Sequence, residues 1–224
     1  MARVLMRGGG PLTRVSGASD LRTTGKRISM PDLPNSDPVA IFQRRLTEFS
    51  PKEVVRRYIT SGPCAKVDGE SYANARQRIA DHFEVHHTNV FVVGSAKLGF
   101  SVAPAKRFRE FNDESDIDVA IVSPELYLRV WRQLSDLLNA DPGFLWEKHT
   151  LLKKKHLTGW LRPDALPPSP ALPLVDEWFE FFRELTGDQV FGPYHVSAGI
   201  YYDIHFLESY QERAVAMCQM EDVS

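Results

Sequence analysis

Residues 90–123 read VFVVGSAKLGFSVAPAKRFREFNDESDIDVAIVS and contain two apolar runs, each joined to a polar turn. Residues 89–93 are rich in β-branched and aromatic side chains and are followed at once by a glycine, which is typical of a buried strand. Residues 117–122 predict a second strand, and Ser123 followed by Pro124 predicts the start of a helix. This stretch therefore predicts two strands of one sheet, separated by a long connection.

Helical spacing of apolar residues dominates the chain on both sides of this stretch. Helices are predicted over residues 39–49, 51–59, 71–83, 124–139, 145–160, 174–185 and 207–217, and a third strand over residues 194–206. Residues 162–173 hold five prolines and predict a loop or internal linker. Helices interleaved with at least three strands predict an α+β fold, with a small mixed β-sheet flanked by helices.

The first 38 residues differ in composition from the remainder. They contain a run of three glycines, several arginines and no apolar periodicity, which predicts a disordered basic N-terminal tail. An Arg-rich, acid-poor segment also resembles an organelle transit peptide, and a plain solvated tail is the simpler interpretation. Residues 39–224 are predicted to form one domain.

Charge and cysteine content limit the classes of function. Residues 1–30 carry a net charge of +5 while the whole chain carries −2, so the remainder sums to −7. An acidic body argues against a protein that coats duplex nucleic acid, since that affinity comes from clustered Lys and Arg. No apolar run is long enough to span a membrane. Cys64 and Cys218 have no metal-type spacing, and two thiols in a chain of this length do not form a disulfide framework. A reducing compartment is therefore expected, and the cytoplasm is the predicted location.

Asp116 and Asp118 are the strongest candidates for chemistry. They are two residues apart at the start of a predicted strand, so both side chains are expected on one face of the sheet. Two such carboxylates repel one another unless a cation lies between them. Mg²⁺, or Mn²⁺ in its place, is the expected cation because it binds a few carboxylates while keeping room for water and phosphates.

Gly94 and Ser95 form a second candidate feature, at the end of the first predicted strand. Glycine lets the backbone approach an anion closely, and exposed N–H groups with a serine hydroxyl hold phosphate oxygens. Lys97 and Gly99 extend the same turn. Together these residues predict a cradle for the phosphates of a nucleoside triphosphate.

The order of the two features, Gly94-Ser95-x-x-x-Gly99 and then Ser115-Asp116-Ile117-Asp118-Val119, resembles the signature of the DNA polymerase β-like nucleotidyltransferase superfamily. The resemblance covers about 35 residues. It implies that Gly94, Ser95, Lys97 and Ser115 contact the nucleotide and that Asp116 and Asp118 are metal ligands. The superfamily usually adds a third carboxylate on a later strand, and Asp203 is the candidate, between alternating aromatic residues. Members act in toxin–antitoxin and antiphage systems, among other roles.

The resemblance implies a metal-dependent transferase that moves a nucleoside monophosphate from a triphosphate to an acceptor hydroxyl and releases pyrophosphate. The acceptor stays open between a protein side chain, an RNA end, a small molecule and a second nucleotide. A weakened fold that only binds nucleotide or a partner protein is the alternative, favoured if Asp203 lies far from Asp116 and Asp118. A further alternative is an RNA-binding module that uses Lys153, Lys154 and Lys155.

The connection between the two features is longer than is usual in the superfamily. It spans 20 residues from Ser95 to Asp116 and contains Lys106, Arg107 and Arg109. Such an insertion either reaches over a substrate or forms a surface loop, and the surface loop is the favoured interpretation.

Overall fold

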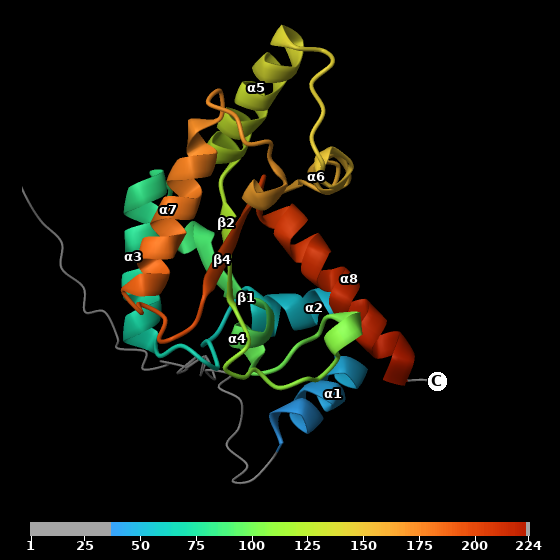
Figure 1. The fold of residues 1–224 in the computed structure, drawn as a ribbon. Coiled ribbons are helices and arrows are strands. Elements are labelled where there is room, and N and C mark those ends of the chain that lie inside the picture. The colour runs from blue at the N-terminus through green and yellow to red at the C-terminus, as the bar shows by residue number, and fades with distance from the viewer. Residues whose placement is uncertain (1–36, 223–224) are drawn as a thin grey trace, which may run out of the picture. The chain divides into compact units, whose positions relative to one another are not determined.

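The structure of the protein, a computed structural model, describes residues 37–222 (Figure 1). The helices are α1 (Pro38–Glu48), α2 (Pro51–Val54), α3 (Gly69–Phe83), α4 (Gly94–Leu98), α5 (Pro124–Ala140), α6 (His149–His156), α7 (Pro173–Gly187) and α8 (Ile204–Asp222), and the strands are β1 (Val90–Val93), β2 (Ile117–Val122), β3 (Trp160–Leu161) and β4 (Val196–Tyr201). The predicted tail lies outside the described residues except at its end, because Pro38 already belongs to α1.

The helix starts follow from capping residues that are visible in the sequence. Ser50 Oγ accepts the N–H of Glu53, and the Glu53 carboxylate accepts the N–H of Ser50. Ser123 Oγ likewise accepts the N–H of Leu126, at 3.1 Å, where α5 begins. These bonds satisfy backbone N–H groups that the first turn of a helix leaves unpaired. The chain therefore enters α2 and α5 at the predicted positions.

The sheet is mixed and has the strand order β1-β2-β4-β3. β1 is antiparallel to β2, β2 is parallel to β4, and β3 is antiparallel to β4. The parallel pairing requires a long crossover, which α5, α6, β3 and α7 supply. The predicted α+β class, with a mixed sheet flanked by helices, is confirmed.

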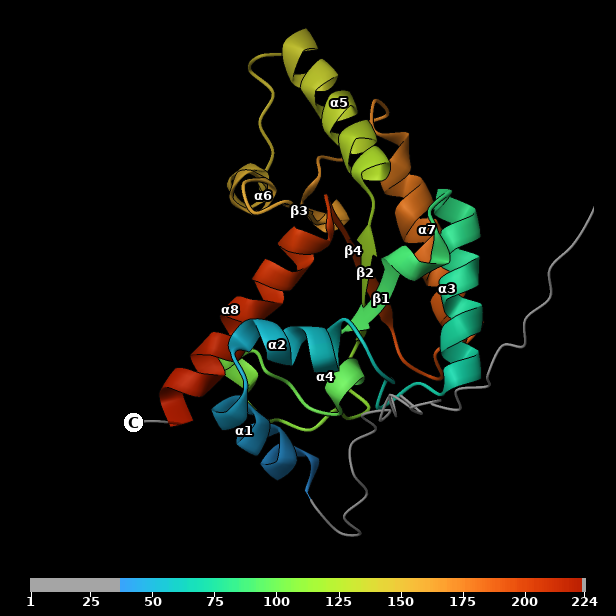
Figure 2. The ribbon, with the colours of Figure 1, turned by 180° about the vertical axis from the view of Figure 1, so that it is seen from behind.

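Helices α3, α5 and α7 cover one face of the sheet (Figures 1 and 2). Alternate residues of β2 point to this side, and Ile117 and Ile121 are fully buried there. Phe83 of α3 and Trp178 of α7 pack in the same core, with ring centroids 4.7 Å apart. Because side chains alternate along a strand, the residues of β2 that lie between those of this apolar layer face the opposite side of the sheet.

Helices α1, α2 and α8 lie on the opposite side of the sheet (Figure 2). Ala120 and Val122 of β2 pack there with Phe42 of α1 and Leu207 of α8. A π-helical turn, Val55–Ile59, continues α2 into this second core. Asp118 shares its parity with Ala120 and Val122, so its side chain belongs to this face as well.

Two predicted elements differ from the structure. Residues 145–160 were expected to be helical throughout, but helix α6 covers only His149–His156 and the chain then enters β3. Residues 194–206 were expected to form one strand, but β4 ends at Tyr201 and α8 begins at Ile204. The alternating aromatic residues after Tyr201 resemble a strand in sequence, although they continue into a helix.

Candidate functional site

Asp116 and Asp118 lie where β2 begins, and both line one pocket with a volume of about 950 Å³. Gly94, Ser95 and Ser115 line the same pocket. Residues of β2, β4, α7, α8 and the loop before β2 also line it. Five of the predicted site residues are therefore brought together, although they come from two separate segments of the chain, 94–95 and 115–118.

Gly94 makes the closest approach between the two predicted features. Its φ of +67° lies in the left-handed region, and a Cβ atom at this position would stand 2.7 Å from Asp118 Oδ2. Val93 is paired with Asp118 across β1 and β2, which brings the bend to the carboxylate. Only glycine fits both the backbone conformation and the contact. The bend and the acidic pair are thus parts of one site.

Asp118 carries a negative charge that its surroundings only partly compensate. Its side chain reaches solvent through the pocket, yet it is recessed among protein atoms, and this desolvation raises its pKa. Ser197 Oγ donates a hydrogen bond to Asp118 Oδ1 at 3.0 Å and opposes that shift. The charge of Asp116 raises the pKa further, which shows that the two carboxylates act on each other. A cation would relieve this repulsion.

Asp116 lies beside His195. Its side chain is 56% exposed, and its Oδ1 lies 3.4 Å from Nδ1 of His195, which is 66% exposed. The backbone N–H of Ile117 donates to the His195 carbonyl oxygen at 2.8 Å and holds the two segments together. Asp116 and His195 therefore present two neighbouring, solvent-exposed polar groups to the pocket.

Aromatic side chains close the inner end of the pocket. Trp160 and Tyr201 are stacked with an interplanar angle of 3° and a centroid distance of 5.6 Å, and Tyr210 of α8 meets Trp160 edge to face. Trp160 fits over β4 only because residue 199 is a glycine, since a Cβ atom there would overlap the indole. All four residues line the pocket.

Lys97 is not part of the site, so its predicted contact with the nucleotide is wrong. Its side chain is 3% exposed, its Nζ donates to the carbonyl oxygen of Gly62 at 2.7 Å, and it does not line the pocket. Burial lowers the pKa of its ammonium group. Lys97, the fourth residue of helix α4, points into the protein, which the turn-like sequence around Gly94 did not reveal.

Asp203 is also separated from the acidic pair, contrary to the sequence-based expectation. Asp118 pairs with Ser197 at the start of β4, and four residue steps to Tyr201 already span roughly 13 Å. Asp203 lies beyond that end, where its Oδ1 accepts the N–H of Phe206 and caps α8. Ser197, at the register where a third carboxylate would meet Asp118, has no acidic group.

Of the three carboxylates predicted as metal ligands, only those of Asp116 and Asp118 line the pocket. Within residues 37–222, no group of three or more His, Cys, Asp and Glu side chains is arranged to hold a metal ion. Mg²⁺ is commonly held by one or two carboxylates together with substrate phosphates and water. Asp116 and Asp118 fit an ion that arrives with a phosphate ligand, and they do not fit one held by protein side chains alone.

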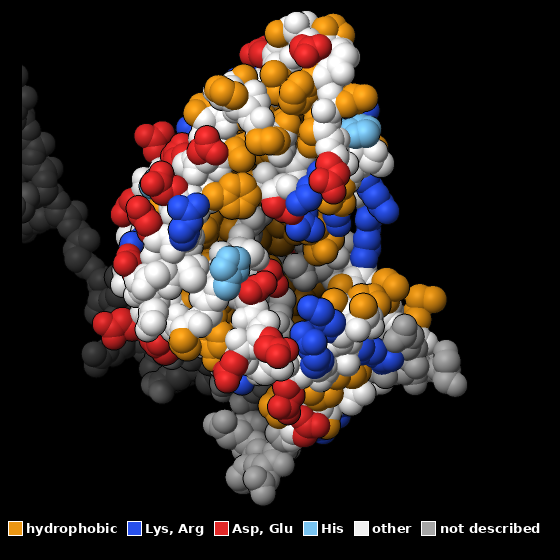
Figure 3. Space-filling view, viewed as in Figure 1, with side chains coloured by type: hydrophobic (Ala, Val, Ile, Leu, Met, Phe, Trp, Pro, Cys, Tyr) orange, Lys and Arg blue, Asp and Glu red, His pale blue; other side chains and the backbone are white. Residues whose placement is uncertain are grey.

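Several basic groups surround the pocket, and the blue side chains beside the central hollow in Figure 3 belong to this face. Lys106 and Arg109 line the pocket from the long connection before β2, so this connection, although largely exposed, also forms part of the pocket. Arg162 and Arg183 contribute from the other side. The positive charges of Lys106 and Arg162 both act to lower the pKa of Asp118.

Arg162, Asp164 and Ser197 are pocket residues that the sequence reasoning missed. The first two stand in the Pro-rich segment 162–173, where an arginine and an aspartate two residues apart directly follow an apolar pair. The two charged residues at that spacing were the sign in the sequence that this segment contributes to a site. Ser197 gave none, because strand register cannot be read from a single strand.

No family model, curated protein sequence or solved structure matches this chain. Within the part of the chain that the structure describes, no helix is long and apolar enough to cross a membrane.

Proposed function

We propose that the pocket binds the magnesium complex of a nucleoside triphosphate. The observation that carries the proposal is the contact between the Gly94 bend and Asp118, inside the pocket that Asp116 also lines. A bend of this kind accepts phosphate oxygens at close range, and the aspartates supply the carboxylates that a phosphate-bound Mg²⁺ requires. Ser95 and Ser115 add hydroxyl groups at the same wall.

The charges of the pocket support the same ligand. Asp116 and Asp118 repel each other without a cation, and the same pocket is lined by the basic side chains of Lys106, Arg109, Arg162 and Arg183. A magnesium triphosphate offers a positive ion to the acids and anionic oxygens to the bases. The two sets of side chains are therefore satisfied together by one ligand.

Transfer of the nucleoside monophosphate to an acceptor hydroxyl is the second candidate function. The resemblance to the polymerase β-like nucleotidyltransferases supports it, and the exposed position of Asp116 leaves the pocket mouth open to an acceptor. A bound Mg²⁺ would neutralise charge on the departing pyrophosphate. The serine at position 197, paired with Asp118, offers no third carboxylate to take the acceptor proton. We therefore propose nucleotide binding as the first function and transfer as the second.

Calorimetric titration of the full chain with ATP, GTP, CTP and UTP, with Mg²⁺, Mn²⁺ or EDTA, tests the proposal. We expect binding of at least one nucleotide that needs the divalent ion, and loss of binding in the Asp116→Ala, Asp118→Ala double variant. Asp203→Asn is the matched control, because it removes an acidic charge outside the pocket and asparagine caps a helix about as well as aspartate. Metal-independent binding that survives the double variant would contradict the assignment.

The second candidate is tested with α-phosphate-labelled nucleotide, the same metals and a panel of acceptors that includes the protein itself, RNA and a cell extract. Transfer predicts label on one acceptor and release of pyrophosphate, both lost in the double variant. Binding without any release of pyrophosphate assigns the pocket to recognition alone. Salt-sensitive RNA binding that persists in the double variant supports the RNA-binding alternative instead.

A further inference from the structure

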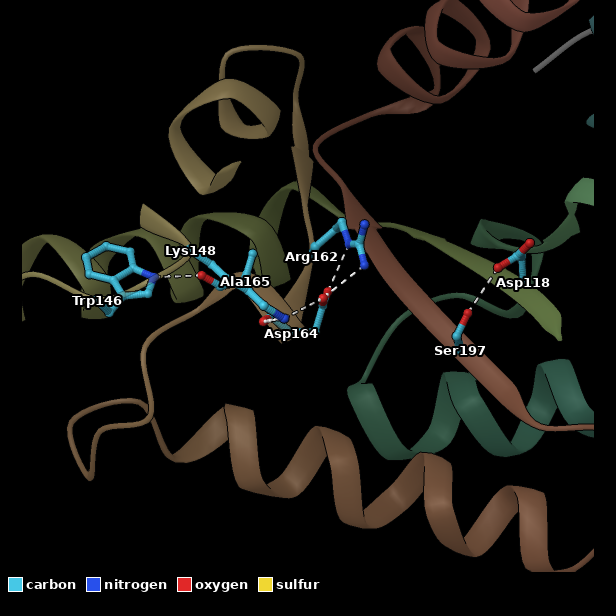
Figure 4. Close-up of polar contacts among 7 residues, drawn as sticks. All are labelled: Asp118, Trp146, Lys148, Arg162, Asp164, Ala165 and Ser197. Carbon is cyan, nitrogen blue, oxygen red and sulfur yellow. Dashed lines mark hydrogen bonds and ion pairs between the residues drawn. The ribbon is translucent and has the colours of Figure 1, made fainter. Parts of the chain in front are cut away.

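Arg162 lines the pocket in which the nucleotide is proposed to bind. It directly follows the edge strand β3, lines the pocket with Asp118, and its positive charge lowers the pKa of that carboxyl group. In Figure 4 its guanidinium is directed toward the side on which Asp118 and Ser197 lie. The side chain is 40% exposed, so a ligand in the pocket can reach it.

Asp164 holds the guanidinium of Arg162 in a fixed orientation. Arg162 Nε donates to Asp164 Oδ1 and Nη2 donates to Asp164 Oδ2, both at 2.9 Å. A pair of parallel bonds of this kind sets the plane of the guanidinium as well as its position. The arginine therefore loses little further freedom when an anion binds.

A second set of contacts fixes Asp164 itself. Lys148 Nζ donates to the backbone oxygen of Asp164 at 3.0 Å and lies 3.3 Å from Asp164 Oδ2. Trp146 Nε1 donates to the carbonyl oxygen of Ala165 at 2.8 Å, which ties down the same short turn, Pro163–Ala165. Lys148 belongs to the segment just before α6, so the arginine is supported from a neighbouring element (Figure 4).

The bonding pattern leaves Arg162 able to bind an anion. Asp164 engages Nε and Nη2, and among the described residues Nη1 has no acceptor. Two cations, Arg162 and Lys148, share the single carboxylate of Asp164, so the group keeps a net positive charge. A preoriented guanidinium with unused N–H donors, facing a pocket, is suited to phosphate oxygens.

We infer that Arg162 binds phosphate oxygens of the nucleotide and that Asp164 is the positioning residue that aims it. The inference rests on the proposed function for the identity of the whole ligand, but the chemistry of Arg162 itself requires only a phosphate chain. A di- or triphosphate is expected rather than a single phosphate, because Arg162 and the Gly94 bend line the same pocket from different segments and a phosphate chain can contact both.

Calorimetry with the wild-type chain and the Arg162→Gln variant tests the arginine. With the tightest of the four magnesium nucleoside triphosphates, we expect the variant to bind about 10- to 100-fold more weakly. Binding of the corresponding nucleoside, which has no phosphate, should not change. Arg132→Gln is the matched control, because it removes the same charge from an exposed position of α5 that does not line the pocket. Circular dichroism melting verifies that each variant is folded.

Asp164→Asn separates positioning from simple charge. Removal of a carboxylate makes the pocket more positive, so electrostatics alone predicts tighter binding of the triphosphate. Loss of the two hydrogen bonds that orient Arg162 predicts weaker binding. We expect the affinity for the triphosphate to fall roughly threefold to tenfold, and Asp164→Glu to restore part of it. Tighter binding by Asp164→Asn overturns the positioning role.

Inorganic tripolyphosphate distinguishes failure of this inference from failure of the proposed function. Equal binding of the nucleotide by wild type and Arg162→Gln overturns the inference while the proposed function stands. If the wild type binds tripolyphosphate but no nucleotide, and Arg162→Gln does not bind tripolyphosphate, the inference is supported and the proposed nucleotide ligand is contradicted. Absence of binding by both ligands to the wild type overturns both.

Discussion

Replacement of Gly94 by alanine tests the contact on which the proposed site depends. The residue has φ +67°, and the added Cβ would stand 2.7 Å from Asp118 Oδ2, well inside ordinary van der Waals distance. The left-handed conformation costs a residue with a side chain about 1 kcal/mol, and displacement of Asp118 from Ser197 removes a hydrogen bond worth about 1 kcal/mol. The expected loss of unfolding free energy is about 2 kcal/mol, or roughly 4–8 °C in melting temperature.

Magnesium-dependent nucleotide binding should fall together with this stability, because the side chain fills the approach to the acidic pair. Thermal melting and calorimetry of the same samples measure the two effects. Gly99→Ala is the matched control: its φ of +88° carries similar backbone strain, but its Cβ would meet Ala65 Cβ at 3.5 Å and Lys66 Cε at 3.9 Å, both ordinary van der Waals distances. We expect Gly99→Ala to melt earlier and still bind. Equal nucleotide affinity for Gly94→Ala and wild type would refute the reasoning.

Three other substitutions are informative. Ser197→Asp places a third carboxylate beside Asp118, so it should cost on the order of 1 kcal/mol of stability without metal and increase Mg²⁺ affinity in calorimetry; unchanged affinity would argue against a cation at this position. The pKa of Asp118 is raised in the folded state, so ionisation of this carboxyl group lowers the stability of the fold as the pH rises above the ordinary carboxyl range. Asp118→Asn, which cannot ionise, should therefore have a higher melting temperature than wild type at about pH 7. The difference should vanish near about pH 4, where the carboxyl group becomes protonated in both states. Lys97→Met should leave nucleotide binding intact and stability within about 1 kcal/mol, because the lysine is buried outside the pocket; a loss of binding at unchanged stability would return it to the site.

The sequence was sufficient for the local parts of this architecture. Ser50 and Ser123 identify helix starts because a capping hydroxyl acts within three residues of itself. Asp116 and Asp118 could be assigned to one face because strand periodicity fixes parity within a single segment. The acidic pair and the Gly94 bend were therefore available before any three-dimensional information.

Long-range register was not available from the sequence. Asp203 was chosen because its aromatic neighbours alternate, but the register of β2 with β4 determines which residue meets Asp118, and that residue is Ser197. The role of Lys97 depended on the rotation of a five-residue helix, for which the sequence gave no sign. Arg162 was hidden by the prolines around it, which indicate irregular backbone and say nothing about which way a side chain points.

The parallel pairing of β2 with β4 has a consequence for how the protein is made. Asp118 and Ser197 are 79 positions apart, so a ribosome completes the acidic strand long before the strand that lies beside it emerges. Until then the edge of β2 that β4 will cover remains unpaired, and the aspartates lack the side of the pocket that β4 supplies. The nascent chain is therefore expected to acquire ligand affinity only near the end of translation, and fragments that stop before residue 196 should have none.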